Sequence, residues 1–398
     1  MRNIKGPKSA LSDFIQQSNI RIKNIEKCEN IVESPRISKP KASKRVKYSK
    51  PFELVNSETI KILEEDKLIE NTLQNIDKIE ITDELLNTIS MYLSRKRKMS
   101  KQFFDFLVDK CRDKLVIYDC SMIKDSEFVI SKNLRRLELF QCGQLTESTL
   151  NFILSQMKDL EILKITGAFL IENFNVPSKL KILDVSNCSR LKNSFINNIN
   201  SSLKELEELK LSFCYGFTSE AELFVNVRSL YICETKLSEK FYNNIKTIRK
   251  LSIKRCPNIN SLLDISELEY LDIEGIVTVN HIPSSTKLLS LNITDCVQIE
   301  DLDFINLKYL KAANISLNEN KIEQIFKMKN LKELDISWNV FVGDNILEKL
   351  LNMPTLQKIS VFGCFGLTKM SVDLAYRNRH KFKIIGNPSE TKYLLEEL

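Results

Sequence analysis

The hydrophobic residues of this chain follow one frame, Leu-x-x-Leu-x-Leu-x-x-Cys, which returns from about residue 112 to about residue 365. The clearest copies are Leu134, Leu137, Leu139, Cys142; Leu180, Leu183, Val185, Cys188; Leu206, Leu209, Leu211, Cys214; and Leu288, Leu291, Ile293, Cys296. Looser copies fill the gaps. The ninth position recurs at intervals of 19 to 26 residues, at Cys120, Cys142, Ala168, Cys188, Cys214, Thr235, Cys256, Ile276, Cys296, Ile315, Asn339 and Cys364. The pattern divides this part of the chain into twelve similar turns.

Each turn contains a short Leu-x-Leu segment that predicts one β-strand. Side chains alternate between the two faces of a strand, so the leucines point inward and the residues between them face solvent on a concave side. Burying one leucine is worth roughly 1.5 to 3 kcal/mol, which does not offset the entropy of ordering a whole turn, so neighbouring turns must stack. Such a frame is the leucine-rich repeat. It predicts an α/β leucine-rich-repeat solenoid, a curved horseshoe with a parallel concave sheet of about twelve repeats.

The length of each turn predicts what lies on the convex side. The residues 146–149, Thr-Glu-Ser-Thr, are of the type that caps a helix, and they run into the apolar stripe of residues 150–154. The longer turns therefore predict a convex helix, whereas turns of 19 to 21 residues leave room only for a single helical turn or extended chain. At the far end, residues 381–386 predict one last strand that caps the array.

Two segments precede the repeats and divide the chain into a tail at 1–50, a block at 51–112 and the repeat domain at 113–398. The block shows helical spacing, for example at Leu85, Leu86, Ile89 and Leu93. A repeat array needs its first leucine layer covered, so the block is predicted to be an N-terminal cap. A helical block ahead of leucine-rich repeats is also where F-box-type ubiquitin-ligase subunits bind their adaptor. The basic run at 95–98 is predicted to end a helix, where cations complement the helix dipole.

The positive charge of the chain belongs to the tail. The net charge is +7, but residues 1–50 hold 13 Lys or Arg against 4 Asp or Glu, so the remainder carries a net charge of −2. This polar, proline-broken tail is predicted to be disordered. Its basic run contains Lys41, Lys44, Arg45 and Lys47, which favour a nuclear import signal or a phosphate-binding arm and equally a solvated linker.

A short apolar stripe interrupts the tail. Leu11, Phe14 and Ile15 have the spacing of one helix face within an otherwise polar stretch. The stripe is too short to hold a helix alone, so it suits a motif that orders against a partner. Docking back onto this chain would satisfy the same pattern.

The cysteines are predicted to be structural. Seven of the ten occupy the ninth position of the frame, where a small polar side chain turns inward and bonds the backbone of the neighbouring loop, and Asn339 fills the same position. A ladder with roughly 20-residue spacing is not a Cys-x-x-Cys metal pattern. Cys28, Cys111 and Cys233 are left over and are interpreted as ordinary thiols. Reduced thiols fit an intracellular compartment, as do an N-terminus without a secretory segment and the lack of an apolar run that would span a membrane.

No pattern of catalytic residues is present in the sequence. Its nine glycines form no phosphate-binding loop, and its two histidines, His281 and His380, suggest no Ser-His-Asp or Cys-His arrangement. We therefore expect no enzyme and no cofactor.

The concave face is the surface that the sequence offers to a partner. Its solvent-facing lysines and tyrosines in the middle turns are Lys164, Lys210, Tyr231, Lys250, Lys254 and Tyr270, interrupted by Asp184, Asp272, Glu333 and Asp335. Twelve strands at about 4.8 Å spacing give an inner arc of roughly 50 Å. These lysines and tyrosines fit DNA phosphates or an acidic partner, while the mixed signs fit a solvated face equally well.

Four places in the sequence resemble one family, the leucine-rich subunit of global-genome nucleotide excision repair, called radiation-sensitivity protein seven in fungi. They are the N-terminal motif at residues 6–15, the segment 93–107 that leads into the first repeat, residues 139–146 with 166–171, and residues 361–364 with 385–386. The first motif is the most specific because it lies outside the repeats. The resemblance is nearly end to end, although the repeats alone would match many F-box proteins.

The resemblance implies a non-catalytic nuclear subunit that works with a Swi/Snf-type ATPase carrying a RING domain, binds damaged chromatin DNA and joins an elongin-C and cullin ubiquitin ligase. The motif residues that it assigns to partner binding are Gly6, Pro7, Ser9, Ala10, Leu11, Phe14 and Ile15. The chain departs from the family pattern in its short basic tail and in the absence of a Cys-x-x-Cys pair before the helical block, so the resemblance carries over neither a metal site nor direct damage binding by this chain alone. The alternative from the helical block is an F-box-like substrate receptor, with a Skp-type adaptor and no role in repair.

Overall fold

The computed structural model describes residues 67, 81–264, 266–283, 285–378 and 383–386. The chain divides into two compact units, Met1–Ile60 and Lys61–Leu398, and every described residue belongs to the second. The predicted partner motif at residues 6–15, the basic run at 41–47 and all of the helical block from 51 to 80 except Lys67 lie outside the described residues.

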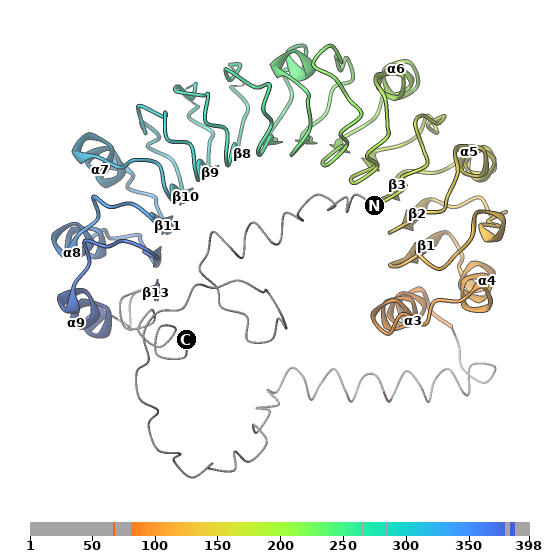
Figure 1. Ribbon diagram of the computed structural model, residues 1–398, viewed down its shortest axis with the longest axis horizontal. Helices are drawn as coiled ribbons and strands as arrows, with labels where there is room; N and C mark the ends of the chain where they lie inside the picture. Colours follow the sequence, from red (N-terminus) through yellow and green to blue (C-terminus); the bar gives the residue numbers. More distant parts are fainter. Residues whose placement is uncertain (1–66, 68–80, 265, 284, 379–382, 387–398) are drawn as a thin grey trace, which may run out of the picture. The chain divides into compact units, whose positions relative to one another are not determined.

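Thirteen short strands form one parallel sheet, and their order in the sheet is their order in the chain. Figure 1 shows the strands on the inner side of the arc that the described repeats form. The strands are β1 Lys114–Ile117, β2 Arg136–Leu139, β3 Ile162–Ile165, β4 Ile182–Asp184, β5 Glu208–Lys210, β6 Ser229–Tyr231, β7 Lys250–Ser252, β8 Tyr270–Asp272, β9 Ser290–Asn292, β10 Tyr309–Lys311, β11 Glu333–Asp335, β12 Lys358–Ser360 and β13 Lys383–Ile385. The predicted leucine-rich-repeat solenoid is confirmed, with twelve repeats and the additional end strand β13.

One column of apolar residues runs through the centre of the sheet. In every strand pair the same frame position is in register, so that Leu183 lies opposite Leu209 and Leu209 opposite Leu230. These three side chains are fully buried. Each leucine thus covers its neighbours in the turns before and after it, which is how turns that are too small to fold alone share one core.

Turn length decides whether a repeat has an α-helix. Each turn of 24 to 26 residues has one, and Figure 1 shows these helices on the outer side of the arc. They are α5 Glu147–Ser155, α6 Asn193–Ser202, α7 Glu319–Lys327 and α8 Asp344–Leu351, and α9 Lys369–Asn378 follows the last complete frame. Among the described residues, the turns of 19 to 22 residues contain either a 3₁₀ segment, η2 Asp125–Glu127 or η3 Glu239–Tyr242, or no helix. The prediction from turn length is confirmed, including Thr146 as the cap of α5.

The described part of the helical block covers the first repeat. Helices α3 Asp83–Arg95 and α4 Lys101–Lys110 begin at Thr82 and Ser100, whose side chains accept hydrogen bonds from free backbone N–H groups. Apolar side chains such as Ile89 and Phe104 are fully buried in the same core as the repeats. The basic run at 95–98 follows the predicted pattern, since α3 ends at Arg95.

Sequence analysis missed a conformation that precedes the ninth position in eleven of the twelve turns. Gln141, Gly167, Asn187, Phe213, Glu234, Arg255, Gly275, Asp295, Asn314, Trp338 and Gly363 all have φ between 51° and 73°. This left-handed conformation is strained for most residues and free for glycine. The conformation turns the chain out of the strand. In nine of these eleven residues the backbone N–H also donates to a carbonyl of the next repeat, as from Phe213 to Cys233 at 2.9 Å. The glycines, asparagines and aspartate at this position are the signal that would have revealed it.

Candidate partner-binding surface

The cysteines of the ninth position form a structural ladder inside the solenoid. The thiol of Cys214 donates a hydrogen bond to the Val185 carbonyl at 3.2 Å, and that of Cys296 donates to the Ile273 carbonyl at 3.1 Å. Burial raises the pKa of the Cys188 thiol to about 12 and that of the Cys296 thiol to about 11. Asn339 replaces cysteine with an amide that bonds five backbone groups. The interpretation of the ninth-position cysteines as backbone partners is confirmed for Cys188, Cys214, Cys256, Cys296 and Cys364. No group of metal-ligand side chains occurs among the described residues.

The structure places all six predicted concave residues on or directly beside the inner strands. Lys164, Lys210, Tyr231, Lys250 and Tyr270 lie within strands β3, β5, β6, β7 and β8, and Lys254 follows β7. Their side chains differ in what they contact. Lys250 is exposed and makes no ion pair with any described residue, whereas the other three lysines bind carboxylates.

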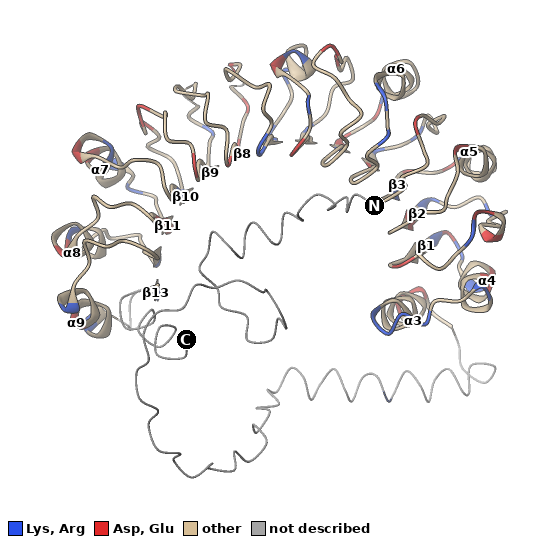
Figure 2. Ribbon diagram, viewed as in Figure 1, with Lys and Arg blue, Asp and Glu red and all other residues tan. Residues whose placement is uncertain are grey.

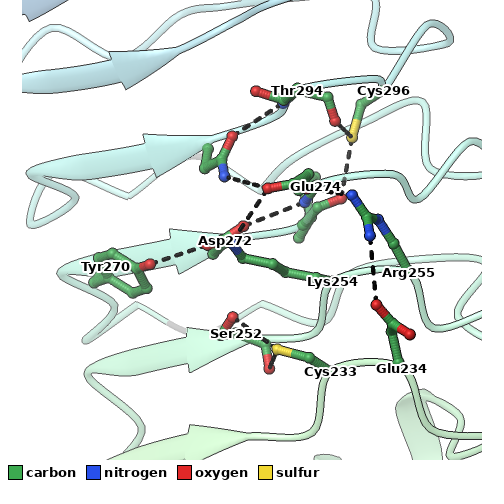
Figure 3. A network of polar contacts seen from close by, with 12 residues as sticks. Cys233, Glu234, Ser252, Lys254, Arg255, Tyr270, Asp272, Glu274, Thr294 and Cys296 are labelled. Atoms are coloured by element: carbon green, nitrogen blue, oxygen red, sulfur yellow. Dashed lines mark hydrogen bonds and ion pairs between the residues drawn. The ribbon is translucent and has the colours of Figure 1, made fainter. Parts of the chain in front are cut away.

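Lys254 is the centre of a polar network that spans three strands. Its ammonium lies 2.9 Å from Asp272 and 3.2 Å from Glu274, and the Tyr270 hydroxyl donates to Asp272 at 3.0 Å. Figure 3 shows these side chains together with Arg255, which pairs with Glu274 and Glu234. Burial alone would lower the pKa of Lys254, but the hydrogen bonds and charges of the two carboxylates outweigh it and raise the pKa. The ammonium of Lys254 is thus already paired with carboxylates of the protein itself.

Two other predicted lysines are bound in the same way. Glu138, whose side chain is buried on the concave face, accepts from Arg136 at 2.5 Å and pairs with Lys164 at 3.1 Å. Lys210 lies 3.0 Å from Glu208 and 5.0 Å from the ring centre of Tyr231. Sequence analysis missed Glu138, although strand register puts it directly opposite Lys164.

The concave face is therefore electrically mixed and not a basic track. Figure 2 shows acidic and basic segments interspersed along the described repeats. A phosphate backbone is held by cations that are free to neutralise it, and three of the four predicted lysines are committed to carboxylates. Whether the six residues form a binding surface stays a prediction, and their geometry favours the solvated alternative over DNA contact.

A second region of the concave side carries exposed aromatic rings that sequence analysis did not single out. Two adjoining cavities of about 550 and 680 Å³ lie over strands β8 to β13, and Lys311, Asp335 and Phe362 line both. Tyr309 lines the first cavity and Trp338 the second, with exposed fractions of 42% and 58%. We call this region the C-terminal groove. The signal for it is an aromatic residue within or just after each of three successive strands, β10, β11 and β12.

The described part of the helical block has one exposed large apolar side chain. Met91 on α3 has an exposed fraction of 45%, which is higher than that of any other large hydrophobic side chain in α3 and α4. Leu86, Ile89 and Leu93 of the same helix are buried against the repeats. The helix thus caps the solenoid with one face and leaves the face around Met91 open.

No helix within the described part of the chain combines the length and apolar character needed to cross a membrane.

A family model described as Leucine Rich repeat matches residues 327–351. The search of curated proteins gave no match.

Solved structures that match this chain include two complexes of other proteins. Rad7, from the crystal structure of the Rad7 and Elc1 complex in yeast, has a TM-score of 0.55 and 20% sequence identity, with coverage of 84% of this chain and 96% of that one. The TLR13–ssRNA13 complex contains a chain with a TM-score of 0.34 and 14% identity, covering 76% of this chain and 60% of that one, and this likeness is too low to carry an argument. The similarity to Rad7 covers most of both chains and shows the fold alone.

Proposed function

We propose that this protein is a non-catalytic scaffold and recognition subunit of nucleotide excision repair. In this proposal it joins an elongin-C-type adaptor and a cullin ubiquitin ligase to a Swi/Snf-type ATPase with a RING domain on damaged chromatin DNA. The observation that carries the proposal is the similarity to Rad7 in its complex with Elc1 over 96% of that chain. Because Rad7 shares this fold and forms a complex with Elc1, we propose an adaptor of the elongin C type for this chain.

The contacts in this proposal fall on different parts of the chain. The helical block is proposed to bind the adaptor, because α3 leaves Met91 exposed beside the first repeat. The N-terminal motif at residues 6–15 is proposed to bind another subunit, from the family resemblance alone. Because Lys164, Lys210 and Lys254 are paired with carboxylates, we assign the DNA contact in this proposal to a partner subunit.

The adaptor assignment is tested by binding of the purified full chain to elongin C and to a Skp-type adaptor. We expect elongin C to be retained, with retention reduced about tenfold or more by Met91→Glu, because a charge desolvated in an apolar contact is costly. Met370→Glu is the matched control, since Met370 lies on α9 at the other end of the solenoid with a similar exposed fraction of 48%. Equal retention by the two variants would move the adaptor contact away from the open face of α3.

The second candidate function is an F-box-like substrate receptor with no role in repair. The helical cap before the repeats supports it as well. Recovery of the Skp-type adaptor alone, with normal survival of ultraviolet light in a strain that lacks the protein, would favour this candidate over the repair subunit.

Nuclear location is part of the proposal and rests on the basic run in the tail. Replacing Lys44, Arg45 and Lys47 by Ala should lower nuclear accumulation of a fluorescent fusion, because import signals are read through their positive charge. The melting temperature of the repeat domain should stay the same, since these residues belong to the other compact unit. Unaltered localisation would leave the run as a solvated linker.

A further inference from the structure

Two aromatic rings of the C-terminal groove, those of Trp338 and Phe362, are packed against glycines. A Cβ atom on Gly363 would lie 2.2 Å from the Trp338 ring, and one on Gly386 would lie 2.4 Å from the Phe362 ring. Each ring thus lies directly against a glycine backbone of the next repeat. Phe365 supports Trp338 edge-on, with 6.5 Å between ring centres. Trp338 nevertheless keeps 58% of its surface exposed, so it is fixed by its neighbours and open to solvent.

Two carboxylates beside these rings have no cationic partner within the described part of the chain. Asp335 accepts hydrogen bonds from the Ser337 backbone and hydroxyl at 3.0 and 2.6 Å, and Asp295 accepts from the Asn314 amide at 2.8 Å. Neither makes an ion pair with any described residue, and both line the 680 Å³ cavity together with Trp338. The one lysine lining that cavity is Lys311, which lies across from Asp335 in the sheet without reaching ion-pair distance.

The other charged side chains that line the groove already have ion-pair partners. Asp272 and Glu274 share the ammonium of Lys254, and Glu333 lies 2.7 Å from Lys358. The charges that remain for a ligand are thus two carboxylates against one lysine. This balance opposes a phosphate backbone and favours a cation. An aromatic face beside a carboxylate is suited to a guanidinium, which stacks on rings and pairs with carboxylates through a planar fork.

We propose that the C-terminal groove binds an extended, arginine-bearing segment of a partner protein. The guanidinium stacks on the open face of Trp338 and pairs with Asp335, while Tyr309 and Phe362 contact neighbouring apolar groups of the segment. Rings that are fixed before binding lose little side-chain entropy on association. The proposal goes beyond the adaptor contact, because the groove lies at the opposite end of the repeat series from α3.

The single tryptophan of the chain makes this proposal directly measurable. Trp338 is the one tryptophan in the sequence, so indole fluorescence of the intact protein reports on this groove alone. The probes are three acetylated peptides of identical length, Gly-Ser-Arg-Gly-Arg-Ser-Gly and the same sequence with glutamine or glutamate for arginine, and an oligothymidylate. We expect saturable quenching by the arginine peptide at low salt, and no saturable change with the other three probes.

Matched variants separate the groove from general electrostatics and from backbone strain. Asp335→Asn should weaken arginine-peptide binding about threefold to tenfold, whereas Asp184→Asn should not, although Asp184 accepts from Ser186 on β4 just as Asp335 accepts from Ser337. Gly363→Ala should weaken binding to a similar extent by displacing Trp338. Gly275→Ala is its control, because Gly275 is also left-handed but a Cβ there meets the flexible side chain of Arg255.

Each remaining outcome would overturn the proposal. Arginine-peptide binding that is equal in Asp335→Asn and Asp184→Asn, or that leaves indole emission unchanged, would place the contact elsewhere. Saturable quenching by oligothymidylate alone would identify a nucleic-acid surface. A change of Trp338 emission on deletion of residues 1–50, without added peptide, would identify the chain's own basic tail as the occupant.

Discussion

At the scale of single residues, the ninth position of the frame controls how one repeat is fastened to the next. A cysteine there contributes one weak thiol donor, while Asn339 donates to three carbonyls and accepts from the N–H groups of Ile315 and Leu317. A buried backbone group that loses its partner costs about 1 to 3 kcal/mol. The side chain at the ninth position therefore contributes very different amounts to the free energy of unfolding in different repeats.

Asn339→Ala is expected to destabilise the protein far more than Cys214→Ala. The first change leaves the buried N–H groups of Ile315 and Leu317 without partners, which predicts a loss of about 2 to 5 kcal/mol. The second removes one thiol hydrogen bond to the Val185 carbonyl, which predicts a loss of about 1 kcal/mol. Urea unfolding followed by circular dichroism measures both. Equal losses would mean that Asn339 fills space and makes no significant polar contribution.

Single residues also show where sequence reasoning ended. The inward direction of Leu209 follows from alternation and was predicted. The ion pair between Lys164 and Glu138 depends on which residues lie opposite each other in neighbouring strands. The prediction of the concave lysines considered each strand alone. The exposure of Trp338 depends on a left-handed backbone and on the absence of a side chain at Gly363, which no hydrophobic pattern records.

At the scale of elements, the start of one convex segment is fixed by a side chain of the segment before it. The Asp125 carboxylate in η2 accepts from the Thr146 N–H at 2.7 Å, from the Thr146 hydroxyl at 3.0 Å and from the Thr149 hydroxyl at 2.8 Å. Asp344 at the start of α8 binds Thr368 ahead of α9 in the same way. Turn length predicted that these helices exist, but not that each is anchored to its predecessor.

Asp125→Ala should cost about 1 to 3 kcal/mol and loosen α5, because three partly buried donors lose a charged acceptor. Hydrogen exchange of the α5 amides should rise more than that of the amides of α8. Asp303→Ala is the matched control, since Asp303 is exposed and makes no hydrogen bond or ion pair with a described residue. The anchoring role would be wrong if the two variants had the same stability.

At the scale of the whole repeat unit, one core continues from α3 to the last repeat. Leu209 contacts the layers of Leu183 and Leu230 on either side and is fully buried. Leu209→Arg places an unpaired charge in this column, so several repeats should unfold together and not one alone. Hydrogen exchange resolved by peptide measures the extent of the loss. Thermal stability equal to that of Lys210→Arg, the solvent-facing neighbour, would contradict the register.

The architecture of the repeat unit follows from the repeat frame, whereas its binding surfaces do not. Twelve repeats, a parallel inner sheet and helices in the long turns follow from periodicity, because stacking allows few other solutions. Binding surfaces do not, because they arise from residues that the frame leaves free, such as Met91 on α3 and Trp338 after β11. The proposed role as a scaffold of a repair ubiquitin ligase therefore has to be tested by identifying the proteins that bind this chain.

Affinity purification of the intact chain from its own cells, followed by identification of the recovered proteins, tests that claim most directly. We expect an elongin-C-type adaptor, a cullin and a Swi/Snf-type ATPase to be recovered together. Recovery of a Skp-type adaptor without the ATPase, or of no ligase component, would contradict it.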